Sequence, residues 1–417
     1  MVQRRTYFEA SKLDELENLA ESAGYKIVGC IEQVREPDPR FQIGAGKVEK
    51  LSQLIKEKKS DRVIFDNFLK PVQAYNLAKN TGVEVIDRFQ LILEIFGRRA
   101  TTAEAKLQIR LARLRYELTH AKEKVRLARK AEQPGFMGLG AYEVDIYYKN
   151  VQRRIRSIRS KLDRIRNRRV LHRNRRTDLG FQSISLAGYT NAGKSSLFNA
   201  LTEEEVEVNE ALFTTLSTKT RMIKALGKEF MLTDTVGFID RLPLTLIEAF
   251  HSTLEETIYS DLILLVLDAS ESINTIHEKL SCCLGTINQI GASAIPRITV
   301  LNKIDLISTA KINRIIKALK ENVSNPVPIS ALHKHNLTFL SKEICRIMKD
   351  YVQASIIIPL NDEYMSFISW LHGRVNVKRL KYENNSAHII FEARLMFIEE
   401  VRKRVVSEFA GTMQRIK

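Results

Sequence analysis

Over residues 1–100 the chain alternates between amphipathic stretches and short apolar runs. Apolar residues recur at helical spacing over 13–23, 48–58 and 72–81. Short runs typical of strands lie at 25–32, 62–65 and 83–86. Helices and strands in this alternating order indicate the α/β class. We predict an N-terminal α/β domain over residues 1–100.

From residue 101 the pattern changes to long helices. Residues 101–132 contain no glycine or proline, and their apolar residues alternate at steps of four and three: Leu107, Leu111, Leu114, Leu118, Ala121, Val125 and Ala128. After a turn-rich break at 133–140 the spacing returns at Val151, Ile155, Ile158, Leu162 and Ile165. This is the seam spacing of a coiled coil. Two seams on either side of one break predict an antiparallel helical hairpin over 101–178.

Two further regions follow the hairpin. Continuous apolar runs at 183–187, 230–233, 262–267 and 298–301 are typical of buried parallel strands, which predicts an α/β domain over 179–350. The rest of the chain has strand-like runs at 354–360, 375–382 and 387–392 and helical stretches at 363–371 and 394–409. We predict a small α/β domain over 351–417, with Trp370 in its core.

A complete phosphate-binding loop follows the first of these buried strands. Residues 188–195 read Gly-Tyr-Thr-Asn-Ala-Gly-Lys-Ser. Gly188 and Gly193 allow the backbone to curl so that its N–H groups point at phosphates. Lys194 is expected to reach the β- and γ-phosphates, Ser195 to ligate Mg²⁺ and Ser196 to hold the α-phosphate. The chain is therefore predicted to bind a nucleoside triphosphate in a P-loop fold.

Two segments after the loop have the order expected of a nucleotide switch. Residues 212–216 offer threonine hydroxyls to the metal, and the next strand ends in Asp234-Thr235-Val236-Gly237. A carboxylate at Asp234 can hold a water bound to Mg²⁺, and the Gly237 N–H can sense the γ-phosphate. The arrangement predicts a nucleotide-dependent conformational change.

The last two motifs select the base. A strand at 298–301 leads into Asn302-Lys303-Ile304-Asp305, and Ser330-Ala331-Leu332 follows later. The Asp305 carboxylate can accept hydrogen bonds from N1–H and the exocyclic amine of guanine, whereas adenine has an acceptor at N1 and would leave the acid unpaired. Asn302 is expected to brace the loop, Lys303 to lie along the base and the Ala331 N–H to meet the guanine carbonyl. GTP is the predicted nucleotide.

The chain has 66 basic and 49 acidic residues, a net charge of +17, and the excess is concentrated in the second hairpin arm. Asp163 is the only acid between residues 149 and 176. A helix with charges of one sign repels itself and is favoured by a polyanion, to which it binds with a steep salt dependence. We expect RNA rather than DNA, because no groove-reading module is visible. The predicted RNA-binding residues are Arg153, Arg154, Arg156, Arg159, Arg164, Arg166, Arg168 and Arg169.

Composition suggests a cytoplasmic protein. The four cysteines have no CxxC spacing, so we expect buried thiols in a reducing compartment. The N-terminus has no apolar signal core, and no run of about 18 apolar residues occurs. We expect a cytoplasmic monomer without a membrane partner.

These motifs together resemble the HflX-type GTPases, a translation-factor-related family of the TRAFAC class. The resemblance rests on residues 41–49, 63–67, 106–118, 188–199, 234–239 and 246–250. The hairpin tip at 133–143 lacks a GPGE core and looks like the archaeal branch. The resemblance implies binding to the large ribosomal subunit through the basic N-terminal and hairpin regions, and a role in ribosome dissociation, rescue or quality control. It also implies that Thr215, which follows Phe213, is the switch threonine and a Mg²⁺ ligand.

The predicted nucleotide-binding residues are Gly188, Tyr189, Thr190, Asn191, Ala192, Gly193, Lys194, Ser195, Ser196, Phe213, Thr214, Thr215, Asp234, Thr235, Val236, Gly237, Asn302, Lys303, Ile304, Asp305, Ser330, Ala331 and Leu332. The residues expected to act in hydrolysis are Lys194, Thr215 and Gly237. The metal ligands are Ser195 and Thr215, with Asp234 acting through water.

Hydrolysis is expected to be slow. A glutamine after DxxG would orient the attacking water, but this position is Phe238, which cannot hydrogen-bond to water. Either a partner brings a catalytic group, or a cation takes its place. Asn191 occupies the loop position from which asparagine binds K⁺ in some related GTPases, so K⁺ is a predicted activator beside Mg²⁺.

Two other functions are compatible with the sequence. One is an NTP-dependent RNA-remodelling enzyme with a second nucleotide site in the N-terminal domain. Residues 44–47, Gly-Ala-Gly-Lys, lack the first glycine of a phosphate loop, and we interpret them as a turn that enters a helix. The other is a non-catalytic RNA-binding protein gated by GTP. His333 and His335 could suggest a metal pair, but we interpret them as polar loop residues.

Overall fold

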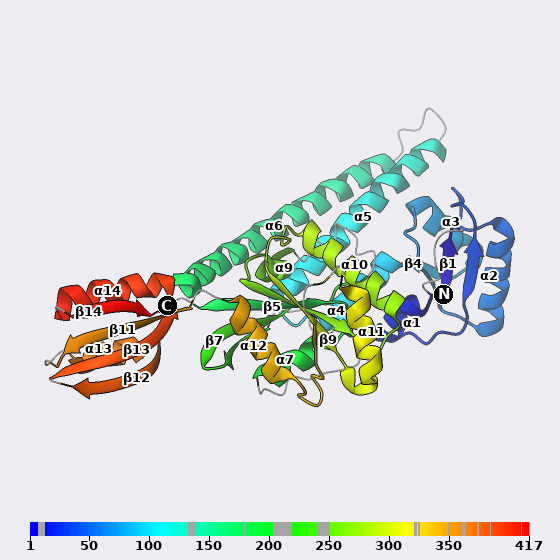
Figure 1. Cartoon of the computed structure of the whole chain (residues 1–417). Helices are drawn as coiled ribbons and strands as arrows, with labels where there is room; N and C mark the ends of the chain where they lie inside the picture. Colours follow the sequence, from blue (N-terminus) through cyan, green and yellow to red (C-terminus); the bar gives the residue numbers. More distant parts are fainter. Residues whose placement is uncertain are drawn as a thin grey trace. The chain divides into compact units, whose positions relative to one another are not determined.

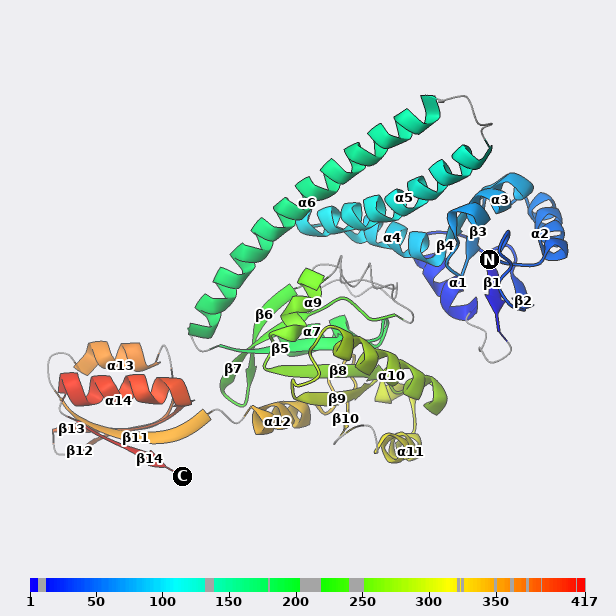
Figure 2. The ribbon, with the colours of Figure 1, turned by 90° about the horizontal axis from the view of Figure 1, so that it is seen from above.

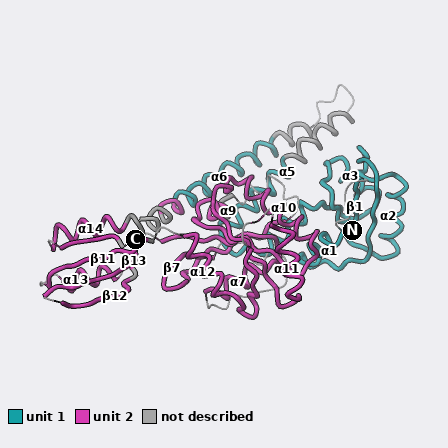
Figure 3. The backbone as a smooth tube through the Cα atoms, viewed as in Figure 1, with its two compact units in different colours: residues 1–167, 209–217, 241–253 teal, residues 168–208, 218–240, 254–417 magenta. Residues whose placement is uncertain are grey.

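The structure is a computed structural model of the whole chain. It describes residues 1–6, 13–131, 139–178, 181–202, 219–239, 251–320, 323, 326–348, 351–360, 364–372, 375–383, 385–409 and 411–416. The chain divides into two compact units (Figure 3). One comprises residues 1–167, 209–217 and 241–253, and the other comprises 168–208, 218–240 and 254–417.

The N-terminal domain is a parallel sheet with helices, as predicted. The strands are β1 (Val2–Arg5), β2 (Ile31–Val34), β3 (Arg62–Phe65) and β4 (Glu84–Asp87), in the spatial order β2-β1-β3-β4. The helices are α1 (Leu13–Ser22), α2 (Ala45–Lys58), α3 (Pro71–Thr81) and α4 (Arg88–Arg99). Apolar residues of β1, β3, α2 and α3 form one buried core. Figure 1 shows these elements in blue and cyan.

The local sequence explains where these helices begin. Gly44 is the N-cap of α2, so residues 44–47 enter a helix, as predicted. Pro71 opens α3, where its fixed φ suits the first turn. The buried Asp87 caps α4 by accepting the Gln90 N–H at 2.9 Å. Burial raises the pKa of Asp87.

The second strand is not where the sequence predicted it. Residues 25–30 do not form a strand, and β2 begins at Ile31 because its register is set by parallel pairing with β1, Val2 opposite Ile31. The strand β1 itself had no clear sequence signal. Within the 24–30 loop Cys30 is exposed, which contradicts the expectation of buried cysteines, whereas Cys283 is buried. The N-terminal loop therefore remains on the surface.

Two long helices follow, α5 (Ala103–Ala131) and α6 (Leu139–Asp178), and they lie side by side in Figures 1 and 2. Leu111 and Leu114 of α5 pack against Val151, Ile155 and Ile158 of α6. These are residues of the predicted seam. The side chains of Ala121, Val125 and Ala128 lie outside the described residues, and the coiled-coil geometry stays a prediction.

One tyrosine connects α5 to the N-terminal domain. Tyr116 stacks on Phe89, with ring centroids 5.0 Å apart, and its hydroxyl donates to Asp87 Oδ2 at 3.2 Å. The ring of Phe68 meets Tyr116 edge-on at 6.4 Å. The first hairpin arm is therefore attached to the sheet by both apolar and polar contacts.

The second unit contains a six-stranded sheet in the order β10-β9-β8-β5-β7-β6. Its strands are β5 (Gln182–Gly188), β6 (Lys219–Ala225), β7 (Lys228–Asp234), β8 (Leu262–Asp268), β9 (Arg297–Asn302) and β10 (Val327–Pro328). All neighbours are parallel except β6 and β7. The central strands are buried, which explains their continuous apolar sequences.

The helices of this sheet are α7 (Lys194–Thr202), α9 (His251–Ile258), α10 (Ile273–Gln289), α11 (Thr309–Leu319) and α12 (Leu337–Ile347). Residues of α7 and α12 share one core with the sheet, and α10 contacts β5 and β8. This is the predicted P-loop architecture of a parallel sheet flanked by helices.

The C-terminal region consists of an antiparallel sheet and two helices. Its elements are β11 (Tyr351–Pro359), α13 (Tyr364–His372), β12 (Asn376–Glu383), β13 (Ser386–Arg394), α14 (Leu395–Phe409) and β14 (Thr412–Ile416). The antiparallel sheet has the order β12-β13-β11-β14, and Figure 2 shows α13 and α14 on one of its faces. Trp370 packs against this core but is only half-buried. The strand β14 was not predicted.

Within the described ranges, no helix combines the length and apolar character that crossing a bilayer requires.

The hairpin seam gives a first prediction. Ile158 is 6% exposed in the seam, so Ile158→Ala should destabilise the α5–α6 pair by about 2 to 4 kcal/mol through lost burial and a cavity. Hydrogen exchange of α6 amides, followed by mass spectrometry, measures the loss of protection. The exposed Arg156→Ala is the control. Equal protection in the two variants would show that the seam does not hold the helices together.

Candidate nucleotide and magnesium site

The predicted nucleotide motifs lie at one edge of the six-stranded sheet. Gly188 ends β5, Asp234 ends β7 and Asn302 ends β9. These three parallel strands place their carboxyl ends together, which is where open α/β sheets bind ligands. Segments far apart in sequence therefore meet at one site.

The phosphate loop has the backbone conformations that its glycines allow. Gly188 has φ +149°, and a Cβ there would lie 2.3 Å from the Val266 carbonyl oxygen. Gly193 has φ +89°, and a Cβ would lie 2.1 Å from Asn302 Nδ2. Asn191 has φ +62°, a left-handed conformation that asparagine tolerates better than most residues. Larger residues at the two glycines would displace neighbouring strands and the base motif.

The loop lysine is buried and held by the loop itself. Lys194 Nζ donates to the carbonyl oxygens of Gly188 at 3.1 Å and Tyr189 at 2.8 Å. Burial lowers the pKa of Lys194, and the nearby carboxylate of Asp234 opposes this effect. An ammonium group positioned in this way is ready to receive phosphate oxygens.

A hydroxyl and a carboxylate suited to Mg²⁺ lie beside the lysine. Ser195 Oγ donates to Asp234 Oδ2 at 2.9 Å, and Asp234 is 1% exposed. Both are hard oxygen ligands, and Mg²⁺ usually keeps several waters and takes only one or two protein ligands beside the phosphates. The pair therefore fits Mg²⁺, whose chemistry there is to neutralise charge on the phosphates. Among the described residues no group of three or more His, Cys, Asp or Glu side chains could hold a metal by itself.

The DxxG segment lies directly against the phosphate loop. A Cβ at Gly237 would be 2.9 Å from Lys194 Nζ, so only glycine fits. The next residue, Phe238, pairs with the loop through two backbone hydrogen bonds, from its N–H to Gly188 O at 3.0 Å and from the Thr190 N–H to its own carbonyl at 2.8 Å. Phe238 is 2% exposed. The position that commonly carries a catalytic glutamine is thus an apolar, buried side chain.

One buried amide joins the phosphate loop to both base motifs. Asn302 Nδ2 donates to Ala192 O at 3.0 Å, and Asn302 Oδ1 accepts the Ala331 N–H at 3.0 Å. Asn302 is 2% exposed. The base-contact loop and the phosphate loop are therefore positioned by the same side chain.

The guanine-selecting carboxylate is oriented by its neighbours. A hydrogen bond from the Ser330 side chain is the main reason that the pKa of Asp305 lies below its usual range. The same hydrogen bond helps to fix the orientation of the carboxylate that is predicted to accept from guanine. His333 Nε2 lies 4.0 Å from Asp305 Oδ2, and its ring lies 5.8 Å from that of His335. Leu332 is 76% exposed beside this loop.

The sequence did not single out Asp268, which completes the base side. Asp268 ends β8, and its Oδ2 lies 2.5 Å from Lys303 Nζ, while Oδ1 accepts the Ser270 N–H at 2.9 Å. This ion pair restrains the long side chain of Lys303, whose backbone has the left-handed φ of +65°. The sequence signal that could have identified Asp268 is an aspartate directly after the continuous apolar run 262–267, at the strand end where ligands bind.

The structure gives fewer contacts, or none, for the remaining predicted residues. Phe213, Thr214 and Thr215 lie outside the described residues, so the switch threonine stays a prediction. Thr235 Oγ1 donates to Leu186 O at 2.6 Å and is buried, a contact that positions the strand end. Ser196 follows Ser195 at the start of α7.

The predicted RNA-binding arginines lie on α6. Arg153, Arg154, Arg156, Arg159, Arg164, Arg166 and Arg168 are exposed, and Arg169 is half-buried. The seam residues Val151, Ile155 and Ile158 face the other arm. The helix therefore separates an apolar face from a basic, solvent-exposed face.

Comparison with known proteins identifies the family. The chain matches three family descriptions: "GTP-binding GTPase N-terminal" over residues 10–97, "GTP-binding GTPase Middle Region" over 99–176 and "50S ribosome-binding GTPase" over 183–303. It is 43% identical over 403 residues to GTPase HflX of Methanocaldococcus jannaschii, which covers 97% of this chain and 98% of that protein. The chain belongs to the HflX GTPase family.

More distant relatives agree with this assignment. GTPase HflX of Escherichia coli is 37% identical over 332 residues, covering 78% of this chain and 77% of that protein. A crystal structure of a complex of SsGBP with GDP is 31% identical, with a TM-score of 0.47, and the match covers 84% of this chain and 98% of that one. Membership of the HflX GTPase family, shown by the sequence matches, makes the chain a GTP hydrolase, as the sequence motifs predicted.

Base selection by Asp305 can be tested directly. Asp305→Asn replaces two acceptors by one acceptor and one donor, so guanine loses its bidentate partner, while xanthine, which has a carbonyl in place of the exocyclic amine, gains one. We expect GTP affinity to fall about 100-fold or more and XTP affinity to rise. Equilibrium titration with fluorescent GTP and XTP analogues measures both. A variant that binds GTP normally would remove Asp305 from base recognition.

Proposed function

We propose that this GTPase uses its nucleotide state to control binding to the large ribosomal subunit, in ribosome dissociation, rescue or quality control. In this proposal the basic N-terminal region and hairpin contact ribosomal RNA. The nucleotide domain changes their affinity for RNA according to whether GTP or GDP is bound. The observation that carries the proposal is the exposed row of arginines on α6.

The charge on α6 favours a polyanion over plain solubility. Arg153, Arg156 and Arg159 recur at three-residue steps and are all exposed. Residues at this spacing lie on the same side of a helix, where like charges repel one another unless phosphates neutralise them. Arginine also forms bidentate phosphate contacts and stacks on unpaired bases. This chemistry supports RNA as the partner.

The family descriptions support a ribosomal partner. The description that matches residues 183–303 reads "50S ribosome-binding GTPase". The chain direction supports coupling, because α6 ends at Asp178 and β5, which leads into the phosphate loop, begins at Gln182. Because this connection is short, a conformational change at the nucleotide site could alter the position of the basic helix, and the reverse.

The nucleotide site supplies a physical basis for two states. Gly237 and Lys194 lie against each other, so a γ-phosphate that contacts both would change the path of the segment after Gly237. Without a glutamine at position 238, turnover depends on a group from elsewhere. We propose that the partner or a K⁺ ion near Asn191 provides it. Asn191 is exposed on the phosphate loop, where its oxygen is available to a cation.

Subunit binding should depend on the nucleotide. In sedimentation with purified large ribosomal subunits, we expect about tenfold tighter binding with a non-hydrolysable GTP analogue than with GDP, a coupling common in switches. Arg153→Glu, Arg156→Glu and Arg159→Glu together should weaken binding and lower its salt dependence.

A matched triple variant tests whether total charge alone matters. Lys317→Glu, Lys320→Glu and Lys342→Glu change the same charge at exposed sites on α11, at its end and on α12, which are not part of the hairpin. This variant should bind subunits like the unmodified chain. Equal binding in GTP and GDP would refute the switch, and equal losses in the two triple variants would refute a specific role for α6.

The K⁺ proposal has its own test. We expect GTP hydrolysis to be about tenfold faster in K⁺ than in Na⁺, the rate equivalent of roughly 1.4 kcal/mol of transition-state stabilisation. Asn191→Gly removes the side chain but keeps the left-handed backbone, so the ratio of the K⁺ and Na⁺ rates should fall to one. Equal rates in the unmodified chain would exclude K⁺ as the activator.

A further inference from the structure

One cavity of the N-terminal domain lies away from the usual ligand edge of its sheet. It has a volume of about 1020 Å³ and is lined by the 24–29 loop, the starts of β3 and β4, and the ends of α2 and α4. Nucleotides in open α/β sheets bind at the carboxyl ends of the strands, whereas this cavity is at the amino ends. We call it the N-terminal groove.

The floor of the groove is apolar. Leu51, Leu54 and Ile55 of α2 and Val63 and Ile64 of β3 contribute to its lining. Val28, on the facing loop, is 44% exposed. Gly29 has no side chain, and a Cβ at this position would lie only 3.1 Å from Leu54 Cδ2. The loop can therefore approach α2 closely. Leu51, Ile55, Val63 and Ile64 are themselves buried, so an apolar side chain of a partner would contact chiefly Val28 and the half-buried Ile27 and Leu54.

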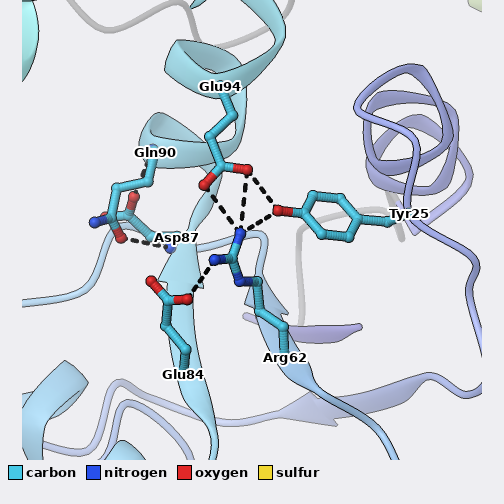
Figure 4. Close-up of polar contacts among 6 residues, drawn as sticks. All are labelled: Tyr25, Arg62, Glu84, Asp87, Gln90 and Glu94. Carbon is cyan, nitrogen blue, oxygen red and sulfur yellow. Dashed lines mark hydrogen bonds and ion pairs between the residues drawn. The ribbon is translucent and has the colours of Figure 1, made fainter.

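One wall of the groove is a neutralised polar cluster, drawn in Figure 4. Arg62 Nη1 lies 3.0 Å from Glu94 Oε1, and Arg62 Nη2 is paired with Glu84. The Tyr25 hydroxyl donates to Glu94 Oε2 at 2.5 Å. Burial, together with this hydrogen bond, raises the pKa of Tyr25. The charge of Arg62 is thus satisfied internally and contributes little attraction to a ligand.

The remaining charge of the lining is mainly positive. Lys26, Lys59, Arg98 and Arg113 line the groove and make no ion pair within the described residues, and Asp61 is the acid that Arg62 does not engage. All four cationic residues are exposed. Gly24, with φ +78°, leaves room for the Arg98 guanidinium, which lies 2.8 Å from where a Cβ would be. The groove combines an apolar floor with a basic rim.

These properties disfavour a small phosphorylated ligand. The groove lies at the carboxyl ends of α2 and α4, where backbone carbonyls give a partial negative charge, whereas phosphates favour helix amino ends. Single-stranded RNA needs aromatic surfaces for its bases, and Tyr25 is the one aromatic residue in the lining. An acidic segment with apolar side chains meets the same partial charge, but its separate carboxylates can be distributed over Lys26, Lys59, Arg98 and Arg113, and it needs no aromatic surface.

We propose that the N-terminal groove binds an acidic amphipathic segment of a partner protein, with its apolar side chains on the α2 floor and its carboxylates at Lys26, Lys59, Arg98 and Arg113. The volume is at the upper end of the range for small-molecule pockets and suits several side chains of a peptide. This is the helix-in-groove mode of recognition.

The test uses the full chain and a defined peptide. The probe is a fluorescent peptide of about 15 residues with Leu and Phe at helical i, i+3, i+4, i+7 spacing and Glu or Asp elsewhere. We expect micromolar binding by anisotropy at low salt. Lys26→Glu with Lys59→Glu should weaken it about tenfold or more. The matched control is Lys56→Glu with Lys79→Glu, which changes the same charge at exposed sites outside the lining and should have less than about a twofold effect.

Two further arms separate a specific groove from general attraction to a basic protein. A peptide with Ser in place of Leu and Phe should bind at least about tenfold more weakly, because the floor is apolar. A peptide with Lys in place of its acids should bind the Lys26→Glu, Lys59→Glu variant better than the unmodified chain. This charge-reversal rescue would not arise from a misfolded domain.

The proposal is overturned if the Ser peptide binds as tightly as the apolar one, or if the two double variants lose equal affinity. It is also overturned if the groove variant loses binding of single-stranded RNA, or of ATP measured in a Lys194→Ala background, while its affinity for the peptide is unchanged.

Discussion

Two hydrogen bonds from one buried amide hold the nucleotide site together. Asn302 donates to the phosphate loop at Ala192 and accepts from the base-contact loop at Ala331. These segments come from different parts of the sequence and would otherwise be connected only through the sheet. Asn302 is almost completely buried, so breaking either hydrogen bond would leave a buried polar group without a partner, which is energetically costly. The phosphate loop, the base-contact loop and the segment that carries Asn302 therefore keep one relative geometry. The predicted roles of Asp305 in guanine recognition and of Lys194 in phosphate binding both depend on that geometry.

The site has residues suited to binding Mg²⁺ and phosphates, but an apolar residue at the position that commonly carries the catalytic glutamine. The residues for Mg²⁺ and phosphates are close-packed, with Ser195 on Asp234 and Gly237 against Lys194. At the next position, however, Phe238 is buried and paired with the phosphate loop through its backbone. An apolar side chain cannot orient water. Among the described residues, position 238 therefore offers no group that could orient the attacking water, which is why we propose that a partner or a cation supplies one.

The charged surfaces of the chain have different chemistry. The exposed face of α6 is arginine-rich and backed by an apolar seam, which suits a rigid contact with a polyanion. The N-terminal groove has an apolar floor, and Glu84 and Glu94 neutralise one of its arginines. Net charge alone would not distinguish these two surfaces. The distinction comes from which cations are already paired and from what lies beside them.

The sequence by itself determined the elements whose signal is local: the phosphate loop, DxxG, the base motifs, the hairpin seam and the P-loop fold class. Each depends on residue types at fixed spacing, so it can be recognised without knowledge of contacts. Tertiary structure decided the rest. The strand β2 begins at Ile31 because β1 sets its register, and Asp268 holds Lys303 because β8 and β9 are neighbours. The N-terminal groove exists because the 24–29 loop, two strands and two helices leave space between them. Such features depend on pairs of residues distant in sequence, and no periodicity along the chain encodes them.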